Sequence, residues 1–301
     1  MSAPSTRKVH AALLTVQVLF ALWPVAGASL LDVMSPAALV GVRLAAGAPI
    51  LFFAAGLHRE RPPPARDLFV LAGLGALGIT INQLLFVGGL ARSGPVNASV
   101  AVLLIPPFTA GAALALRRER FVPLRALGVL VALVGGATLV GAERVDPTRF
   151  AGNAMLVGNT LSYGVYLVLA RGTIARLGSL RTVAWVMSTG ALLALPFTLR
   201  DTLAIPWETL SPATWASIVF VVLGPTVLTY LLNAWALSRA DSSLVATYVY
   251  AQPPIAALAS FWFLGLVPAP RVLVAAAIIA VGLTLATRAP SASGARYKQP
   301  P

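Results

Sequence analysis

The sequence contains no cysteine, which excludes disulfide bonds, thiol catalysis and metal sites with cysteine ligands. Charged residues are also scarce: they make up 10% of the 301 residues, whereas 58% are hydrophobic. A soluble globular domain has about 25% charged and about 45–50% apolar residues. With a mean hydropathy of +0.86, the composition indicates an integral membrane protein that has the lipid bilayer as a partner.

Acidic residues and histidines are few, and none lies in the middle of an apolar run. His10 and His58 lie at the ends of such runs. The nine acidic residues do the same: Asp32, Glu60, Asp67, Glu119, Glu143, Asp146, Asp201, Glu208 and Asp241. Buried carboxylates are the usual proton relays within membranes, so the sequence predicts a facilitator, an exchanger, or proton coupling through other groups. Because no catalytic or ligand set converges, we expect no enzyme activity, no metal and no cofactor.

The net charge of +13 is a feature shared with nucleic-acid-binding proteins, but the basic residues here occupy the short gaps between apolar runs. This placement is typical of membrane topology signals and leaves no basic face for a nucleic acid. If the N-terminus lies inside, 16 basic residues fall on the inner side and five on the outer side. The sequence therefore predicts a multi-pass protein of the cytoplasmic (inner) membrane with both termini in the cytoplasm.

Ten apolar segments are long enough for transmembrane helices, which need about 20 residues each. They span residues 10–31, 36–57, 67–91, 95–116, 122–142, 150–170, 181–199, 212–237, 242–266 and 270–287. The tails at 1–8 and 289–301 are expected to be disordered and cytoplasmic. The first segment has features of a signal peptide, but its spanning length predicts an uncleaved helix.

The chain repeats itself at a displacement of 147 residues, without a gap from residue 90 to 135. Each copy would hold five helices, an odd number, so the second copy must enter the membrane from the opposite side. The predicted fold is an all-α membrane protein of ten transmembrane helices. Two inverted five-helix repeats, at 9–142 and 150–288, would surround a central cavity.

A Pro-Pro pair interrupts an apolar run at the same place in both repeats. Pro106 and Pro107 match Pro253 and Pro254. Proline removes an amide donor and frees a carbonyl one turn back, and helix breaks at matching places indicate the binding site of secondary transporters. The pairs are therefore expected to act as hinges, although kinks that serve packing alone are an alternative.

Polar and aromatic residues at helical spacing form the predicted substrate cavity. The set comprises Trp23, Asn82, Gln83, Phe86, Asn159, Tyr163, Tyr166, Tyr230, Asn233, Tyr248 and Gln252. Buried amides and phenols need partners in lipid, so they face other helices or a wet cavity. Amides bind polar groups and rings cover apolar ones, which predicts a small, zwitterionic or partly aromatic solute.

Arg43 is the one formal charge within a predicted transmembrane helix. Burying a charge in a membrane is expensive, so such a residue is a functional candidate. Its guanidinium is suited to hold a solute carboxylate through two hydrogen bonds. A structural bond to neighbouring carbonyls is the alternative, and both readings stay open at this point.

Three stretches carry a family resemblance: "LWPVAGASLLDVMSPAALVGVRLAAGAPILF" (22–52), "NQLLFVGGLARSGPVNASVAVLLIPPFTAGAALALRRERFVPLRALGVLVALVGGATLVG" (82–141) and "YLLNAWALSRADSSLVATYVYAQPPIAALASFWFLGLVPAPRVLVAAAIIAVGLTL" (230–285). On these residues the chain resembles the ten-helix EamA family of the drug/metabolite transporter superfamily. The resemblance implies two inverted bundles around a central cavity and movement of small metabolites, often export of amino acids. Glu119 fits a carboxylate that the family often has after helix four, but Leu266 stands at the equivalent position in the second copy.

These observations together predict a secondary transporter that works by alternating access. The expected activity is export of neutral or aromatic amino acids or related compounds by a functional monomer. Transport of another small solute, such as a drug, a sugar or a nucleoside, is the nearest alternative. A receptor or scaffold without transport activity is a further one, but it would leave the duplicated helix breaks unexplained.

Overall fold

The computed structural model describes residues 6–117, 122–141, 146–237 and 248–288, and within these ranges all regular structure is helical. Most of the two predicted tails, the start of the predicted helix at 242–266, and Glu119, Glu143 and Asp241 lie outside the described residues. The first half of the chain contains α1 (Thr6–Leu30), α2 (Pro36–Ala54), α3 (Ala65–Gly75), η2 (Ala76–Ile81), α4 (Asn82–Ala101), η3 (Val102–Leu104), α5 (Ile105–Ala115) and α6 (Pro123–Gly141). The second half contains α7 (Pro147–Leu177), α8 (Ser179–Leu203), α9 (Pro212–Val222), η5 (Leu223–Leu228), α10 (Thr229–Leu237), η6 (Tyr248–Ala251), α12 (Gln252–Leu264) and α13 (Pro270–Arg288).

Three of these helices begin at a short polar side chain followed by proline. Ser35 accepts a hydrogen bond from the amide of Ala38 at the start of α2, and Ser211 caps α9 in the same way. Asp146 accepts from two amides at the start of α7. Such a residue satisfies amides that lack an intrahelical partner, and proline fits the first helical position because it needs no donor there.

Equivalent elements of the two halves are displaced by the same 147 residues that relate their sequences. The bounds of α3 and η2 become those of α9 and η5, and the bounds of α6 become those of α13. Both η2 and η5 are π-helical. The continuous helices predicted at 67–91 and 212–237 are therefore interrupted, which the sequence analysis missed. π-Helical turns inside helices are frequently found at functional sites.

The predicted helix at 95–116 is also divided. Gly94, with φ 78° and ψ 173°, kinks α4 in the gap between the helices predicted at 67–91 and 95–116. The 3-10 turn η3 then separates α4 from α5.

In the second half of the chain, a single residue, Gly178, separates α7 from α8. Its φ of 83° lies in the left-handed region, which a glycine adopts without steric cost.

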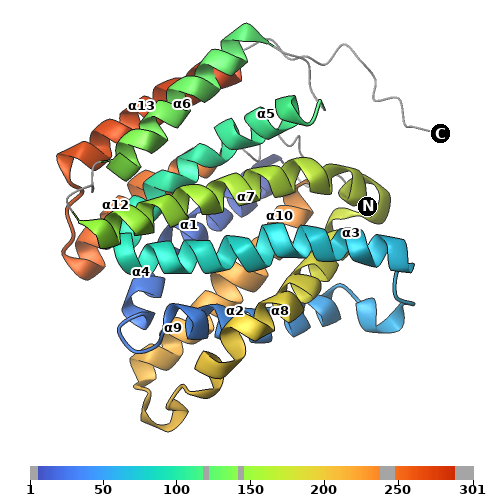
Figure 1. Ribbon diagram of the computed structural model, residues 1–301. Coiled ribbons are helices and arrows are strands. Elements are labelled where there is room, and N and C mark those ends of the chain that lie inside the picture. The colour runs from blue at the N-terminus through green and yellow to red at the C-terminus, as the bar shows by residue number, and fades with distance from the viewer. Residues whose placement is uncertain (1–5, 118–121, 142–145, 238–247, 289–301) are drawn as a thin grey trace.

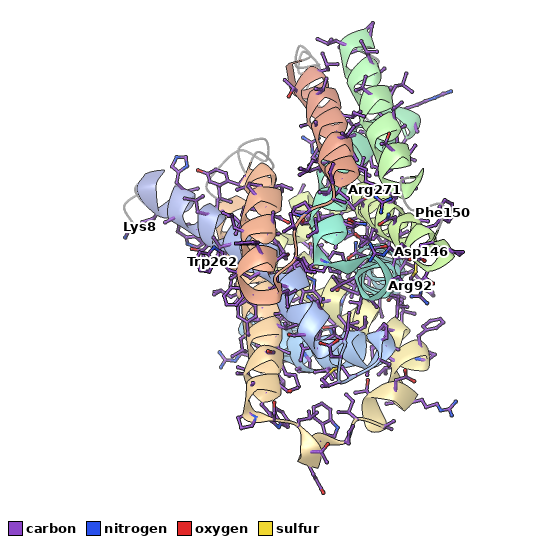
Figure 2. All side chains as sticks on the ribbon, turned by 90° about the vertical axis from the view of Figure 1, so that its left-hand side faces the viewer. Lys8, Arg92, Asp146, Phe150, Trp262 and Arg271 are labelled. Atoms are coloured by element: carbon purple, nitrogen blue, oxygen red, sulfur yellow. The ribbon has the colours of Figure 1, made fainter. Side chains whose placement is uncertain are left out.

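Five helical stretches within the described residues are long and apolar enough to cross a membrane. They are Lys8–Leu30, Pro36–Ala54, Ala65–Ala115, Ser179–Leu203 and Pro212–Asn233. Shorter apolar helices cover Ala126–Thr138, Pro254–Leu264 and Pro270–Gly282. Large side chains on the outer faces are exposed, and Trp262 on α12 is 78% exposed (Figure 2). These features describe a multi-pass membrane protein, whereas the count of ten crossings stays a prediction.

The helices of the two halves pack on one another in pairs. α6 lies beside α13 at one edge of the molecule, and α2 packs on α8 at the other (Figure 1). α4 and α7 cross between these edges, while α1 packs on α12. Gly135 and Gly282 bring α6 and α13 together: a Cβ atom on Gly282 would lie 2.4 Å from the amide nitrogen of Ala132. The absence of a side chain at these two glycines therefore allows the close contact of α6 with α13.

Candidate functional site

Arg43 is the centre of a buried polar cluster that joins the two halves of the chain. Its side chain projects from α2 and the residue is only 4% exposed. Nε and Nη2 donate to the hydroxyl of Thr226 in η5, at 3.1 and 3.0 Å, and Nη1 donates to the amide oxygen of Gln83 in α4. The described hydrogen-bond acceptors of this cation are therefore neutral oxygen atoms.

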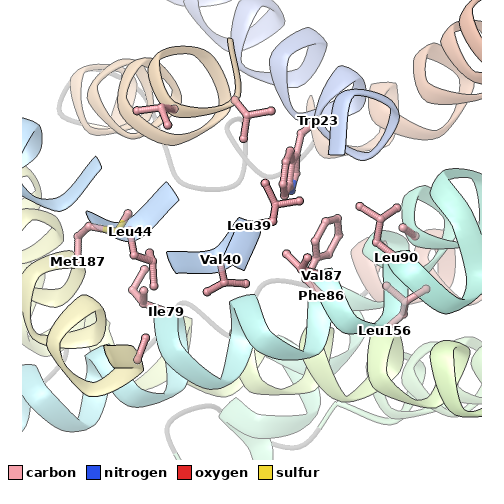
Figure 3. Packing of buried hydrophobic residues seen from close by; sticks show 14 of the residues in the cluster. Trp23, Leu39, Val40, Leu44, Ile79, Phe86, Val87, Leu90, Leu156 and Met187 are labelled. Carbon is pink, nitrogen blue, oxygen red and sulfur yellow. The ribbon is translucent and has the colours of Figure 1, made fainter. Parts of the chain in front are cut away.

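Aromatic rings cover one side of the guanidinium. Its Cζ atom lies 3.9 Å from the centre of the Trp23 ring, a cation–π contact. Trp23 in turn stacks on Phe86, with 5.9 Å between the ring centres. Figure 3 shows these two side chains projecting toward each other from α1 and α4. The predicted cavity residues Trp23, Gln83 and Phe86 thus lie around Arg43.

Three tyrosines extend the cluster into the second half. Tyr230 of α10 lies close to Arg43 and to Tyr163 and Tyr166 of α7. The rings of Tyr163 and Tyr166 are 5.5 Å apart. We call Trp23, Arg43, Gln83, Phe86, Thr226 and Tyr230 the Arg43 cluster. With the two α7 tyrosines beside it, the cluster combines one cation, two uncharged oxygen acceptors and several rings.

The predicted residues Asn82 and Asn159 bond to each other's main chain. The Asn82 side-chain amide donates to the carbonyl of Asn159 at 3.3 Å, and the Asn159 amide donates to that of Asn82 at 2.8 Å. One turn further along α7, Ser162 donates to the carbonyl of Leu77 in η2 at 2.7 Å. These bonds fasten α7 to the start of α4 and to the π-helical segment η2 that precedes it.

A second polar group joins α1 to the start of α12. The amide of Gln252 donates to the amide oxygen of Gln17 at 2.6 Å, with both side chains buried. His10 hydrogen bonds to the hydroxyl of Tyr248. The predicted cavity residues Tyr248 and Gln252 therefore lie against α1, apart from the described contacts of the Arg43 cluster. The amide oxygen of Asn233 is buried and has no hydrogen-bond partner within the described residues.

Both Pro-Pro pairs lie in the first turn of a helix that follows a 3-10 turn. Pro106 and Pro107 follow η3, and Pro253 and Pro254 follow η6. The helix is thus interrupted immediately before each pair, where proline requires no amide donor. Their role as hinges stays a prediction.

Several residues of these polar contacts were missed by the sequence analysis. Thr226 accepts a hydrogen bond from Arg43, and Gln17 accepts one from Gln252. Asn97 donates to Asn153 at 3.0 Å and so joins α4 to α7. An amide in the middle of an apolar run was a usable signal for Gln17. Thr226 offered little, because threonine is common in helices and often bonds its own main chain.

Polar contacts also join the halves at the two ends of the helices. Arg176 at the end of α7 makes two hydrogen bonds with Asp67 at the start of α3, at 2.6 and 2.7 Å, and Arg181 pairs with Glu60 at 2.9 Å. At the opposite ends, Ser93 donates to the carbonyl of Arg149 at 3.0 Å. Figure 2 looks onto this second end and shows Arg92, Asp146 and Arg271 there.

Two surface hollows lie away from the Arg43 cluster. One is apolar and lies between α2 and α8, where Phe52, Phe53 and Leu192 contribute to its wall. The other follows α13 at Val281 and Thr284. Neither includes a residue of the predicted substrate cavity. The predicted cavity residues are instead buried or half-buried among the helices.

Comparison with known proteins gives a family match in both halves of the chain. Residues 7–141 and 150–288 each match the EamA-like transporter family. The chain is 29% identical to the "Probable terminal-alkyne amino-acid exporter" of Streptantibioticus cattleyicolor, over 82% of each protein. It is 24% identical to an uncharacterized transporter of Archaeoglobus fulgidus, over 77% of this chain and 80% of that protein. A solved crystal structure with 24% identity has a TM-score of 0.62 and covers 94% of this chain and 98% of its own; this likeness shows the fold alone.

Proposed function

Because the chain belongs to the EamA-like transporter family, within the drug/metabolite transporter superfamily, we propose that it exports neutral or aromatic amino acids or related compounds. It acts as a monomeric secondary transporter of the cytoplasmic membrane. The two halves, 9–142 and 150–288, move against each other in alternating access. The observation that carries the proposal is the Arg43 cluster, which α1, α2 and α4 of one half share with η5 and α10 of the other.

The pairing of helices supports two repeats related by a two-fold axis. α6 with α13 and α2 with α8 are pairs in which each helix is the repeat equivalent of its partner. α1 packs on α12, and the equivalent pair is α7 on α5. With five helices in each copy, such an axis lies in the membrane plane, and the repeats have opposite orientation.

The proposed orientation has ten crossings and both termini in the cytoplasm, and each ion pair joins two helix ends that this topology places on the same side. Asp67 and Arg176, like Glu60 and Arg181, belong to ends that the topology places inside. Arg92, Arg149 and Arg271 belong to ends that it places outside. The bonds that close the halves at the inner ends would break when the transporter opens inward.

The chemistry of the cluster supports an amino-acid-like solute. A guanidinium binds a carboxylate, and the rings of Trp23, Phe86 and Tyr230 cover an apolar side chain. The relative from Streptantibioticus cattleyicolor is named as an exporter of an amino acid. Tyr163 packs beside Tyr166 on α7 next to the Arg43 cluster, and Gln252 joins α12 to α1 through Gln17.

Counterflow in proteoliposomes tests the proposal. Vesicles preloaded with single amino acids, nucleosides or sugars are mixed with a trace of the same labelled solute, with and without a pH gradient. We expect accumulation of neutral or aromatic amino acids, and its loss in Tyr163→Ala and Gln252→Ala at unchanged protein level. Thr138→Ala is the control, because the described hydrogen bond of its hydroxyl is to the carbonyl of Val134 in its own helix. Accumulation of no solute in the panel would overturn the proposal.

A further inference from the structure

Arg43 and Gly190 occupy equivalent positions in the two repeats, since they are separated by the repeat displacement of 147 residues. Each contacts the π-helical segment of the opposite half at an equivalent residue. Arg43 donates to Thr226 of η5, and Gly190 lies against Ile79 of η2, where an added Cβ atom would be 2.5 Å from the Ile79 Cβ. One contact is a charged side chain and the other is close backbone packing.

The contact at Gly190 shows that a helix can pack on the π-helical segment of the opposite half without a cation at this position. The hydroxyl of Thr80 in η2 donates to the carbonyl of Gly190 at 2.8 Å, so α8 and η2 are held by one neutral bond and by packing. α2 also approaches η5 through a glycine: a Cβ atom on Gly47 would lie 2.7 Å from Cγ2 of Thr226. A guanidinium beside Thr226 is therefore more than the packing of these elements requires.

The positive charge of Arg43 has no negative partner within the described residues. A guanidinium carries five N–H donors and stays protonated in proteins. Its described hydrogen bonds engage Nε, Nη1 and Nη2 once each, so two N–H groups are left over. Thr226 is held as an acceptor because its own hydroxyl donates to the carbonyl of Val221 at 2.8 Å. A buried, uncompensated charge is costly in a membrane protein and indicates a functional site.

We propose that Arg43 binds the carboxylate of the transported solute, with Gln83 and Thr226 holding the guanidinium in place and Trp23 stacked on its face. The inference rests on the proposed transport function and names the group that the site recognises. A bound carboxylate supplies the missing negative charge. The repeat equivalent of Arg43 is Gly190, so each transporter has one such subsite, displaced from the axis that relates the halves.

Competition by matched solute pairs tests this recognition in the unmodified protein. Unlabelled phenylalanine is compared with phenylalaninamide, and leucine with leucinamide, as competitors of counterflow by the preferred labelled amino acid. Because a hydrogen bond to a charged group contributes about 1.5–3 kcal/mol, the carboxylate member should compete at least tenfold better than the amide. Equal competition by acid and amide would overturn the inference while leaving transport established. If no solute is exchanged at all, it is the proposed function that fails.

Substitutions at Arg43 separate solute recognition from a structural role. Arg43→Gln should weaken competition by the acid about 10- to 100-fold and leave the amide unchanged, and Arg43→Lys should recover part of the loss. A structural role would instead lower exchange of acid and amide alike, together with the melting temperature. If Arg43→Gln does not fold, Thr226→Val retains the charge and loosens its placement, and a reduced preference for the acid is expected. If Thr226→Val keeps the wild-type preference for acid over amide, Thr226 does not hold the guanidinium in the binding position, which contradicts the inference.

A small inorganic anion such as chloride is the alternative to a solute carboxylate as the negative partner of Arg43. Replacing chloride by gluconate on both sides of the vesicle should leave the preference for acid over amide unchanged. If removal of chloride slows exchange of acid and amide equally, chloride occupies the site and the inference is wrong.

Discussion

Asn82 and Asn159 each donate a side-chain hydrogen bond to the main-chain carbonyl of the other, across the contact of α4 with α7. Interhelical bonds of this kind contribute about 0.6 kcal/mol on average and up to about 1.7 kcal/mol within membranes. Asn82→Ala and Asn159→Ala should each lower the free energy of unfolding by about 1 kcal/mol, because each removes an interhelical hydrogen bond to a buried carbonyl. Thermal unfolding in detergent measures the change.

The control for this prediction is Thr138→Ala, which removes a hydroxyl bonded within its own helix and should change stability by less than about 0.5 kcal/mol. If Asn159→Ala unfolds at the same temperature as Thr138→Ala, the reciprocal bonds do not fasten α7 to α4.

Gly190→Ala tests the close contact of α8 with η2. The added Cβ atom would lie 2.5 Å from the Ile79 Cβ and 2.8 Å from the carbonyl oxygen of Gly75. Overpacking of this kind costs about 1–3 kcal/mol, so we expect a lower melting temperature. Gly172→Ala is the matched control, because nothing lies within 4 Å of its added Cβ. Alanine should stabilise the helix there by up to about 1 kcal/mol, and equal melting temperatures of the two variants would contradict the account.

The absence of cysteine makes the topology directly testable, since each introduced cysteine is the only thiol in the chain. Arg61 and Glu208 are exposed and lie in connections that the topology places on opposite sides. Glu208→Cys should react in intact cells with a thiol reagent that does not cross the membrane. Arg61→Cys should react only after the cells are permeabilised. The reverse pattern would invert the orientation, and labelling of both from outside would refute the predicted number of crossings between them.

The Asp67–Arg176 pair should take part in closing the cytoplasmic side, because it links α3 of one half to α7 of the other. Asp67→Arg places two like charges together and should slow exchange several-fold. The double variant Asp67→Arg/Arg176→Asp restores an opposite pair and should recover most of the rate. Counterflow rates normalised to protein level measure this. A double variant no faster than Asp67→Arg would show that the pair itself is not what matters.

The sequence repeat accounts for much of the described fold. Helices α6 and α13 have equivalent bounds because the same pattern of proline, glycine and apolar residues recurs at 147 residues. The π-helical turns were not predictable from hydropathy, because an extra residue in a turn leaves an apolar run unchanged. Pro225 in η5 was the one local signal, since it removes a backbone donor, and η2 has no proline.

Membership of the candidate site was less predictable than the fold. Amides and aromatic rings within apolar runs indicated Gln83, Trp23 and Tyr230 as candidates, but not which of them meet Arg43. That grouping depends on how α1, α2 and α10 pack, and a helical period sets a face of one helix without setting its partner. Thr226 becomes an acceptor for Arg43 only through the π-helical turn, where its hydroxyl reaches Val221 five residues back.

The most direct test of the account is the counterflow rate of a neutral or aromatic amino acid in proteoliposomes that contain Tyr230→Phe or Tyr230→Ala. Tyr230 lies close both to Arg43 and to the α7 tyrosines. The account predicts active wild-type protein, at least a tenfold loss in Tyr230→Ala at equal protein level, and a smaller loss in Tyr230→Phe, which retains the ring. Wild-type exchange that persists undiminished in Tyr230→Ala would contradict a transport site at the Arg43 cluster.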